Sequence, residues 1–279
     1  MGKRALLIGI NYEGSQLALN GCINDVDNVQ AWIVQHCGFA EQDITRLDDH
    51  TEIKPTRKNI LNAIDELVVG LKAGDEVLFQ YSGHGSQQID RNRDEPDGYD
   101  EAIVPLDYGS AGLITDDVLR SRLCAAVPAG VNLFCIIDAC HSSTSTDLKY
   151  VFEDRSRYRG RYKPSRYESS KWLTSTLTTH QRQYTETAAN VLCISGCRDN
   201  STSADAWVAG EGYTGAMTWG LLKTLKNAKA EGRDALSVQR LIKDTSGYLR
   251  VAGYRQVPSI SSGRKIGLSQ AAWVIFPGK

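Results

Sequence analysis

The chain has 279 residues, of which 41% are hydrophobic and 23% are charged, as is ordinary for a globular protein. The 32 basic and 33 acidic residues give a formal net charge of −1, which argues against a dedicated nucleic-acid binder. No apolar run approaches the roughly 18 to 20 residues needed to cross a bilayer, and the short apolar stretch after Lys3 is shorter than a signal peptide requires. We therefore expect a protein with no nucleic-acid or membrane partner.

The cysteines favour a reducing compartment. There are 7 of them, an odd number, and Cys135 and Cys193 lie inside apolar runs, as buried free thiols do. No Cys-x-x-Cys pair and no Cys/His spacing of the zinc type occurs. These features exclude a disulfide scaffold and lead us to expect a cytoplasmic protein.

Short apolar runs alternate with amphipathic stretches along the chain. The runs predict strands at 5–10, 43–47, 76–81, 131–138, 191–195 and 273–276. The amphipathic stretches predict helices near 24–37, 56–72, 115–126, 214–228 and 236–250. This alternation predicts an α/β fold, with a mostly parallel central sheet and helices on both faces. Ligands of such sheets bind beyond the carboxyl ends of the strands.

Two of these strand ends carry residues suited to nucleophilic catalysis. The strand at 76–81 runs into Tyr-Ser-Gly-His-Gly, which contains His84, and the strand at 131–138 runs into Asp-Ala-Cys-His-Ser, which contains Cys140. If these strands are neighbours, the thiol and the imidazole lie side by side, as a cysteine nucleophile and its proton carrier must. The amides of Gly85 and Cys140 are candidate oxyanion donors. His141 is less suitable as the base, because adjacent side chains at a strand end point to different faces.

Asp138 adds a preference for cationic substrates. It precedes Cys140 by two residues, so both side chains belong to the same face of the strand. A carboxylate at that position favours a positively charged side chain next to the scissile bond, and arginine can bind it through two hydrogen bonds.

The two motifs resemble those of the metacaspases, the caspase-fold peptidases of plants, fungi, protists and bacteria. The segments Gly-Cys-Ile-Asn-Asp at 21–25 and Ser-Gly-Cys-Arg-Asp at 195–199 extend the resemblance over roughly residues 3–275. It implies a caspase-like three-layer sandwich and a calcium-dependent endopeptidase that cleaves proteins or peptides after Arg or Lys through a Cys140/His84 dyad. By the same resemblance the pocket for that residue (S1) comprises Asp25, Ser82, Asp138 and Ser195. A helix N-cap or a surface charge is the alternative for Asp25.

The resemblance also carries expectations about size and assembly. The absence of a Pro-rich or zinc-finger extension before Lys3, and the short join between the two halves, resemble a type I core or a bacterial or protist relative. We expect one peptidase domain over 1–279, acting as a monomer. Its large-subunit-like region would cover 1–148 and its small-subunit-like region 189–279, on either side of a basic exposed loop at 149–188.

Acidic residues crowd the segment between 90 and 117, and Asp147 follows seven positions after Cys140. The spacing is not that of an EF-hand. A solvated acidic loop with a helix N-cap at Thr115 or Asp116 is the plain alternative. The resemblance instead assigns calcium ligands to Asp100, Asp116, Asp117 and Asp147.

Basic residues crowd the segment 149–182, which holds nine Lys or Arg and three acids and is predicted to be a long exposed loop. The rest of the chain therefore carries 23 basic and 30 acidic residues. If the enzyme cuts after Arg or Lys, this segment is a substrate for itself. The autocleavage candidates are Lys149, Arg155, Arg157, Arg159, Arg161, Lys163, Arg166, Lys171 and Arg182. A solvated loop that contacts an acidic partner is an equally good interpretation.

Two functions of other classes compete with the peptidase. A catalytically silent scaffold or regulatory protein of the same fold has no need to keep Cys140, His84 and Asp138 together. A phosphate- or nucleotide-binding α/β protein would need a Gly-x-x-x-x-Gly-Lys-Ser/Thr loop, which is absent from the sequence.

Overall fold

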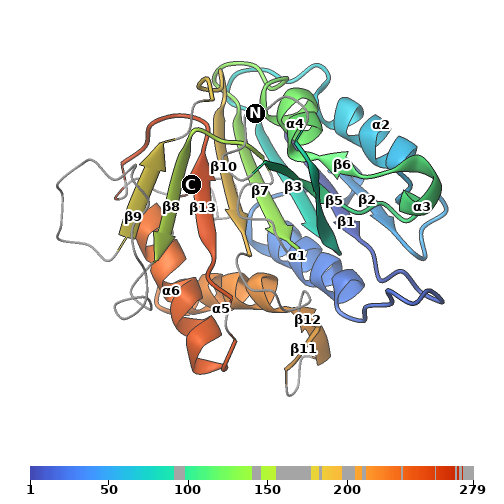
Figure 1. The fold of residues 1–279 in the computed structure, drawn as a ribbon. Coiled ribbons are helices and arrows are strands. Elements are labelled where there is room, and N and C mark those ends of the chain that lie inside the picture. Colours follow the sequence, from blue (N-terminus) through green and yellow to red (C-terminus); the bar gives the residue numbers. More distant parts are fainter. Residues whose placement is uncertain are drawn as a thin grey trace.

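A computed structural model describes residues 1–90, 98–139, 146–154, 177–181, 184–196, 205–208, 212–233, 235–254, 256–267, 269 and 272. Its centre is an eight-stranded sheet in the order β2-β1-β3-β7-β10-β13-β8-β9 (Figure 1). The five strands from β2 to β10 run parallel, β13 is antiparallel to β10 and β8, and β9 is antiparallel to β8. The bounds of the strands, in sheet order, are Ile44–Asp48, Lys3–Gly9, Glu76–Ser82, Asn132–Asp138, Asn190–Ser195, Ser259–Ser262, Tyr150–Asp154 and Leu177–Gln181.

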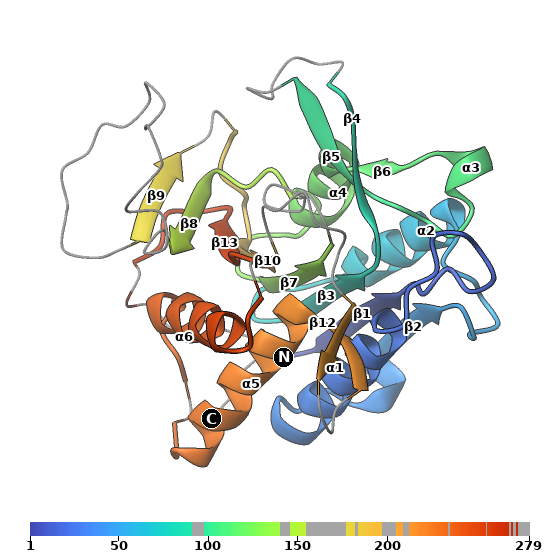
Figure 2. The ribbon, with the colours of Figure 1, turned by 60° about the horizontal axis from the view of Figure 1, so that its bottom comes forward.

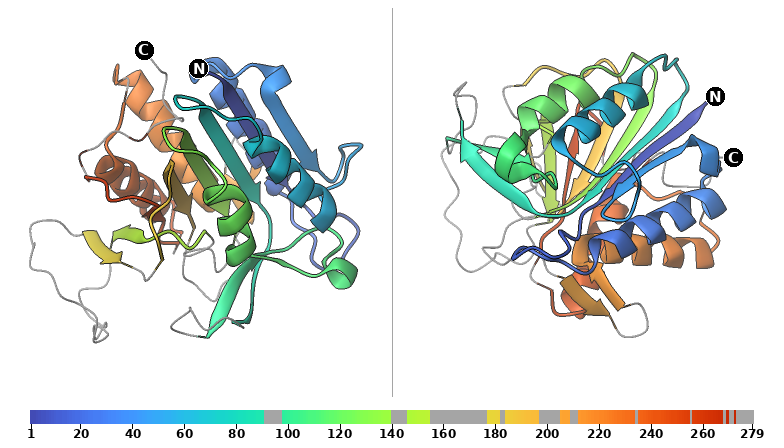
Figure 3. Two further views of the ribbon diagram at one scale, coloured as in Figure 1. Left: turned by 90° about the horizontal axis from the view of Figure 1, so that it is seen from above. Right: turned by 90° about the vertical axis from the view of Figure 1, so that its right-hand side faces the viewer.

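Helices cover both faces of this sheet (Figure 3). One face carries α2 (Arg57–Val68), α4 (Asp116–Leu119) and the π-helical turn η2 (Arg120–Cys124). The other face carries α1 (Cys22–His36), α5 (Ala216–Ala230) and α6 (Val238–Val251).

Alternate residues of each strand serve the two layers. In β1, Leu6 and Ile8 belong to the core beneath α2, whereas Ala5 and Leu7 belong to the core beneath α1 and α5. Strands buried on both sides read as continuous apolar runs, which is why their positions can be predicted from the sequence. The α/β prediction, with a mostly parallel central sheet between helical layers, is confirmed.

Smaller elements surround the carboxyl ends of the parallel strands. A three-stranded sheet contains β4, β5 and β6, and a separate hairpin contains β11 and β12, which lies beside α1 and α5 (Figure 2). The bounds are Gly85–Ile89 for β4, Tyr99–Ile103 for β5, Ile114–Thr115 for β6, Asp205–Val208 for β11 and Gly212–Gly215 for β12. The short helical turn α3 spans Tyr108–Ala111, and η1 (Glu41–Asp43) directly precedes β2, at the amino end of that strand.

The prediction of an exposed loop throughout 149–182 is wrong at both ends of that segment. Its first part forms β8 and its last part forms β9, and Val151 and Phe152 are buried. The many Lys and Arg residues of this segment suggest a loop. The backbone of β8 nevertheless pairs with β13 and β9, and so β8 becomes part of the main sheet. Residues 155–176, Arg182 and the predicted strand at 273–276 lie outside the described residues. Among the residues that are described, no helix has the length and apolarity to cross a bilayer.

Candidate active site

The ends of β3 and β7 are adjacent, as the sequence predicts. Ser82 pairs with Asp138 in the parallel ladder, and the amide of Gly83 donates to the carbonyl of Asp138 at 3.2 Å. His84 therefore stands next to the point where the chain leaves β7. Cys140 and His141 themselves lie outside the described residues, so the predicted thiol–imidazole contact stays a prediction.

The imidazole of His84 is oriented by a backbone carbonyl. Its Nε2 lies 2.8 Å from the carbonyl oxygen of Leu17, in the connection between β1 and α1. A carbonyl only accepts, so the neutral ring carries its proton on Nε2, and Nδ1 is left to exchange a proton with a substrate or a thiol. No sequence pattern could have revealed this partner, because a carbonyl orients the ring whatever side chain the residue bears.

Two buried carboxylates meet next to this strand end. The Oδ2 atoms of Asp25 and Asp138 lie 2.5 and 2.2 Å from the point where a Cβ at Gly215 would stand. Glycine at 215 therefore leaves the space that both carboxylates occupy. The sequence predicts both residues for the S1 pocket, and the structure brings them together.

Backbone amides and a hydroxyl hold this pair in place. The carboxylate of Asp25 accepts from the hydroxyl of Thr214 at 2.6 Å and from the amide of Gly215 at 2.9 Å. Asp138 accepts from the amide of Thr218, at the start of α5, at 2.8 Å. The sequence gives no sign of these partners, because they come from the hairpin β11–β12 and the helix that follows it.

Burial and mutual repulsion weaken the acidity of the pair. Burial, followed by the neighbouring charge of Asp138, raises the pKa of Asp25 to about 8, and burial also raises the pKa of Asp138. Both side chains are nearly inaccessible, so the surface-charge alternative for Asp25 is wrong. The N-cap alternative is wrong too, because Gly21 caps α1 and the Asp25 carboxylate bonds to Thr214 and Gly215.

The two serines assigned to the same pocket differ in their contacts. Ser82 hydrogen-bonds to Asp25 and accepts from the side-chain amide of Gln80 at 2.8 Å. Ser195 lies two strands away from Ser82, on β10, and its hydroxyl oxygen is 2.9 Å from that of Ser259. Asp25, Ser82 and Asp138 thus form one polar cluster, and Ser195 stands at its border.

A second acidic cluster forms where β5, α4 and the connection before β8 approach one another. Asp116 accepts from the amides of Glu101 and Asp117 at 3.0 and 2.9 Å. Burial and the charges of Asp147 and Glu101 raise the pKa of Asp116 to about 10. Asp100, Asp116 and Asp147 are buried, so a solvated acidic loop is the wrong interpretation for these three.

The geometry of this cluster is not that of a finished metal site. Within the described parts of the chain, no group of three or more His, Cys, Asp or Glu side chains is arranged so that it could hold a metal ion. Thr115 is the N-cap of α4, and its hydroxyl accepts from the amide of Val118. This confirms the N-cap that the sequence suggested at Thr115 or Asp116. Asp117 is half-buried beside Asp116. The calcium assignment therefore stays a prediction.

Arg120 joins the second cluster to the far end of the basic segment. Its guanidinium donates to the carbonyl of Asp147, which has a left-handed φ of 45°, and to the carbonyl of Thr185 at 2.8 Å. It also stacks over the ring of Tyr184, 4.9 Å from the centroid. One side chain thus holds the two ends of the basic segment together.

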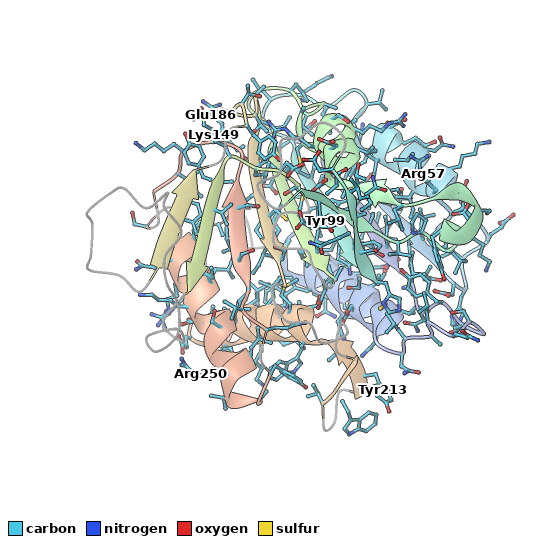
Figure 4. All side chains as sticks on the ribbon, in the orientation of Figure 1. Arg57, Tyr99, Lys149, Glu186, Tyr213 and Arg250 are labelled. Atoms are coloured by element: carbon cyan, nitrogen blue, oxygen red, sulfur yellow. The ribbon has the colours of Figure 1, made fainter. Side chains whose placement is uncertain are left out.

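The part of the basic segment that follows β8 begins at the edge of the sheet that carries His84 and Asp138. The register of the sheet shows this through three neighbouring pairs, which are Glu153 with Ser259, Ser259 with Ser195, and Ser195 with Ile137. The end of β8 is therefore level with the carboxyl end of β7. The chain after β8 therefore leaves at the carboxyl edge of the parallel strands. Lys149 precedes β8 and lies at the opposite edge, close to Glu186 and on the far side of the molecule from Tyr213 (Figure 4).

Known proteins of one family match this chain. Residues 3–149 match the family model for the metacaspase, peptidase C14 domain. Metacaspase-1 of Yarrowia lipolytica is 38% identical over 252 residues, and Metacaspase-1 of Ajellomyces capsulatus is 36% identical over 293 residues. These matches cover 80% and 93% of this chain but 54% and 80% of the two relatives, so the chain spans little more than half of the first. The crystal structure of protein GSU0716 from Geobacter sulfurreducens is 25% identical, covers 97% of both chains and has a TM-score of 0.63.

Proposed function

Because the chain belongs to the metacaspase family, we propose that it is a calcium-dependent cysteine endopeptidase that cleaves proteins after Arg or Lys. The observation that carries the proposal is the buried pair of Asp25 and Asp138 beside the strand end that bears His84. Two carboxylates that share one small space favour a positively charged guest, which lowers their mutual repulsion. An apolar or acidic substrate side chain would leave that repulsion in place.

The proposed reaction passes through a thioester. The thiolate of Cys140 attacks the scissile carbonyl carbon, and the amides of Gly85 and Cys140 bind the oxyanion. His84, held at Nε2 by Leu17, gives its other proton to the leaving amine as the C–N bond breaks. A water then attacks the thioester while His84 takes its proton, and the thiolate leaves.

The acidic cluster is the proposed calcium site. Calcium takes six to eight hard oxygen ligands, and clustered carboxylates match that preference in donor chemistry. Burial, together with the charges of Asp147 and Glu101, raises the pKa of Asp116, so acidic groups do crowd this place. The ligands would be Asp100, Asp116, Asp117 and Asp147. When bound, calcium supplies positive charge that removes the repulsion among them. Since β5 follows His84 and Asp147 follows Cys140 in the chain, these residues would then fix the two catalytic connections relative to one another.

Autoprocessing in the basic segment is part of the proposal. The chain after β8 begins at the same edge of the sheet as His84 and Asp138, whereas Lys149 lies at the opposite edge. Among the candidates we therefore favour those that follow β8 over Lys149: Arg155, Arg157, Arg159, Arg161, Lys163, Arg166 and Lys171. Mass spectrometry after calcium addition tests it. New termini behind these residues are expected, and a fully active preparation with an intact segment would refute this part.

A fluorogenic peptide assay tests the activity itself. Peptides that differ only in Arg, Lys or Asp before the reporter are compared with calcium and with chelator. We expect turnover of the Arg and Lys peptides with calcium, and its loss in Cys140→Ala and His84→Ala. Cleavage that survives Cys140→Ala, or a preference for Asp, would refute the mechanism. A folded wild-type protein that cleaves none of the peptides would favour the scaffold alternative.

A further inference from the structure

Tyr12 has a backbone conformation that residues with side chains seldom adopt. Its φ is 50°, in the left-handed region, although the residue is a bulky aromatic and its side chain is only 1% exposed. Such a conformation is unfavourable and persists only where surrounding contacts enforce it. The contacts of Tyr12 lead directly to His84.

The Tyr12 side chain touches both the backbone and the ring of His84. Its hydroxyl accepts from the amide of His84 at 3.1 Å and donates to the carbonyl of Val104 at 2.6 Å. Its ring lies 4.8 Å from the imidazole, centroid to centroid, at an interplanar angle of 41°. An aromatic ring at this distance stabilises a positively charged imidazolium.

A second buried tyrosine completes the support. The hydroxyl of Tyr81 donates to the carbonyl of His84 at 2.7 Å, and its oxygen lies 3.1 Å from that of Tyr12. A Cβ at Gly83 would stand 2.6 Å from the Tyr81 oxygen and 3.1 Å from the Tyr12 oxygen. The glycine before His84 therefore makes room for the two phenols, which hold both peptide groups of the histidine. Burial raises the pKa of each phenol, so both remain neutral hydrogen-bonding groups.

We propose that Tyr12 is a positioning residue: it fixes the backbone and the ring of His84, and thereby sets the reactivity of the Cys140–His84 dyad. This inference rests on the dyad of the proposed function. An imidazole that is held at Nε2 by Leu17 and supported by Tyr12 across its ring presents its other nitrogen in a single orientation. Without the phenol, the backbone of His84 loses the acceptor for its amide, and the ring is free to tilt.

Tyr12→Phe tests the proposal, because phenylalanine keeps the ring and removes only the hydroxyl. We expect kcat per titrated active site to fall about 10- to 100-fold, the range that a small misplacement of a catalytic group produces. KM should change by less than about twofold, since no substrate contact is lost. The pH profile of Cys140 alkylation by iodoacetamide should shift towards the pKa of about 8.5 of an unassisted thiol. Tyr12→Ala, which removes the ring as well, should shift it further.

Tyr248→Phe is the matched control. It removes a hydroxyl that accepts from the side-chain amide of Asn227, between α5 and α6. That variant should keep the wild-type kcat and alkylation profile. If Tyr12→Phe lowers only the melting temperature and leaves both readouts unchanged, Tyr12 is merely structural and the proposal is wrong.

A second variant keeps the proposal testable if the Tyr12→Phe protein does not fold. Tyr81→Phe leaves the Tyr12 ring on the imidazole and removes the donor to the His84 carbonyl, so it should produce the same shift in smaller measure. An unchanged alkylation profile in folded Tyr81→Phe would also contradict the proposal. Full activity in Cys140→Ala or His84→Ala would refute the proposed function instead, so the two failures are distinguishable.

Discussion

At the scale of single residues, the pair of Asp25 and Asp138 is the feature from which the proposed preference for a basic substrate side chain would arise. Each carboxylate has amide donors that favour its ionised form, but burial and proximity oppose ionisation of both at once. In the proposed substrate complex, a guanidinium or ammonium group between the two carboxylates would replace the proton that Asp25 otherwise holds. Binding of a basic side chain is therefore coupled to release of a proton.

The first prediction follows from the pKa of about 8 at Asp25. Below that pH Asp25 holds a proton that a basic substrate must displace, and above it the site is already ionised. The ratio of kcat/KM for an Arg peptide to that for its citrulline analogue should rise by up to about tenfold per unit between pH 6 and 8, and level off above. The ratio cancels the titration of the dyad, which both peptides share.

Asp25→Asn provides the control for this prediction. Its ratio should be low and nearly independent of pH, because the titrating carboxylate is gone. A wild-type ratio that does not vary across this range would show that Asp25 does not take part in recognition of the basic side chain.

The second prediction concerns Gly215, whose φ of −66° suits any residue, so a substitution tests space and not backbone strain. A Cβ there would meet both carboxylates, 2.2 and 2.5 Å away, and would push them apart. We expect Gly215→Ala to fold but to lose about 100-fold or more in kcat/KM for Arg peptides, the scale of a 1 Å displacement at a site.

Gly247→Ala in α6 is the matched substitution, since no atom lies within 4 Å of the added methyl group. It should leave activity unchanged and stabilise the helix by about 0.5 to 1 kcal/mol in urea unfolding. Equal activities of the two variants would contradict the placement of the substrate pocket over Gly215.

At the scale of elements, the sequence predicts the parallel strands and the main helices, whereas the antiparallel edge is missed. β13 has the sequence Ser-Ile-Ser-Ser, which contains no apolar run, yet all four residues are buried between β10 and β8. β8 lies in a segment whose charge suggests a loop. These strands depend on pairing with distant partners, and a local pattern carries no information about such partners.

The third prediction tests β8 against the loop interpretation. Phe152 is 4% exposed and packs in the core beneath α6. Phe152→Ala should lower the free energy of unfolding by about 3 to 5 kcal/mol, whereas a residue in an exposed loop would lose almost nothing. Val251→Ala, at a position that is 85% exposed, should stay within about 0.5 kcal/mol of the wild type. Denaturant unfolding of the three proteins measures both differences.

At the scale of the whole molecule, the candidate site draws on segments from both halves of the chain. The rule that sites lie at the carboxyl ends of parallel strands was enough to predict His84 and Asp138 at one edge. The same rule could not predict that Tyr12, Leu17 and Gly215 contribute to the candidate site. Tyr12 and Gly215 act through long-range packing and Leu17 through its backbone, and none of these leaves a periodic or spaced signal.

The fourth prediction concerns calcium, whose candidate ligands come from three separate elements. If the acidic cluster binds calcium, the melting temperature should rise with calcium concentration, and each tenfold excess over Kd should add about 1.4 kcal/mol of stability. Magnesium should stabilise much less, because it demands a smaller and more regular shell.

Asp116→Asn is the informative variant for this prediction. It should abolish the calcium effect, because asparagine cannot supply the ionised carboxylate that the proposed site needs. It should change the melting temperature in chelator only slightly, because with a pKa raised to about 10 the carboxyl of Asp116 is already uncharged near neutral pH. A wild-type melting temperature that is the same in calcium and in chelator would contradict the calcium site.

The pairing of β8 with β9 has a consequence for the integrity of the molecule. Tyr150 pairs with Gln181 and Asp154 with Leu177, and Arg120 bonds to the carbonyls of Asp147 and Thr185. These contacts join the chain before the segment 155–176 to the chain after it, and none of them depends on a peptide bond inside that segment. A protein nicked there should therefore migrate as two bands on a denaturing gel but elute from a sizing column as one particle.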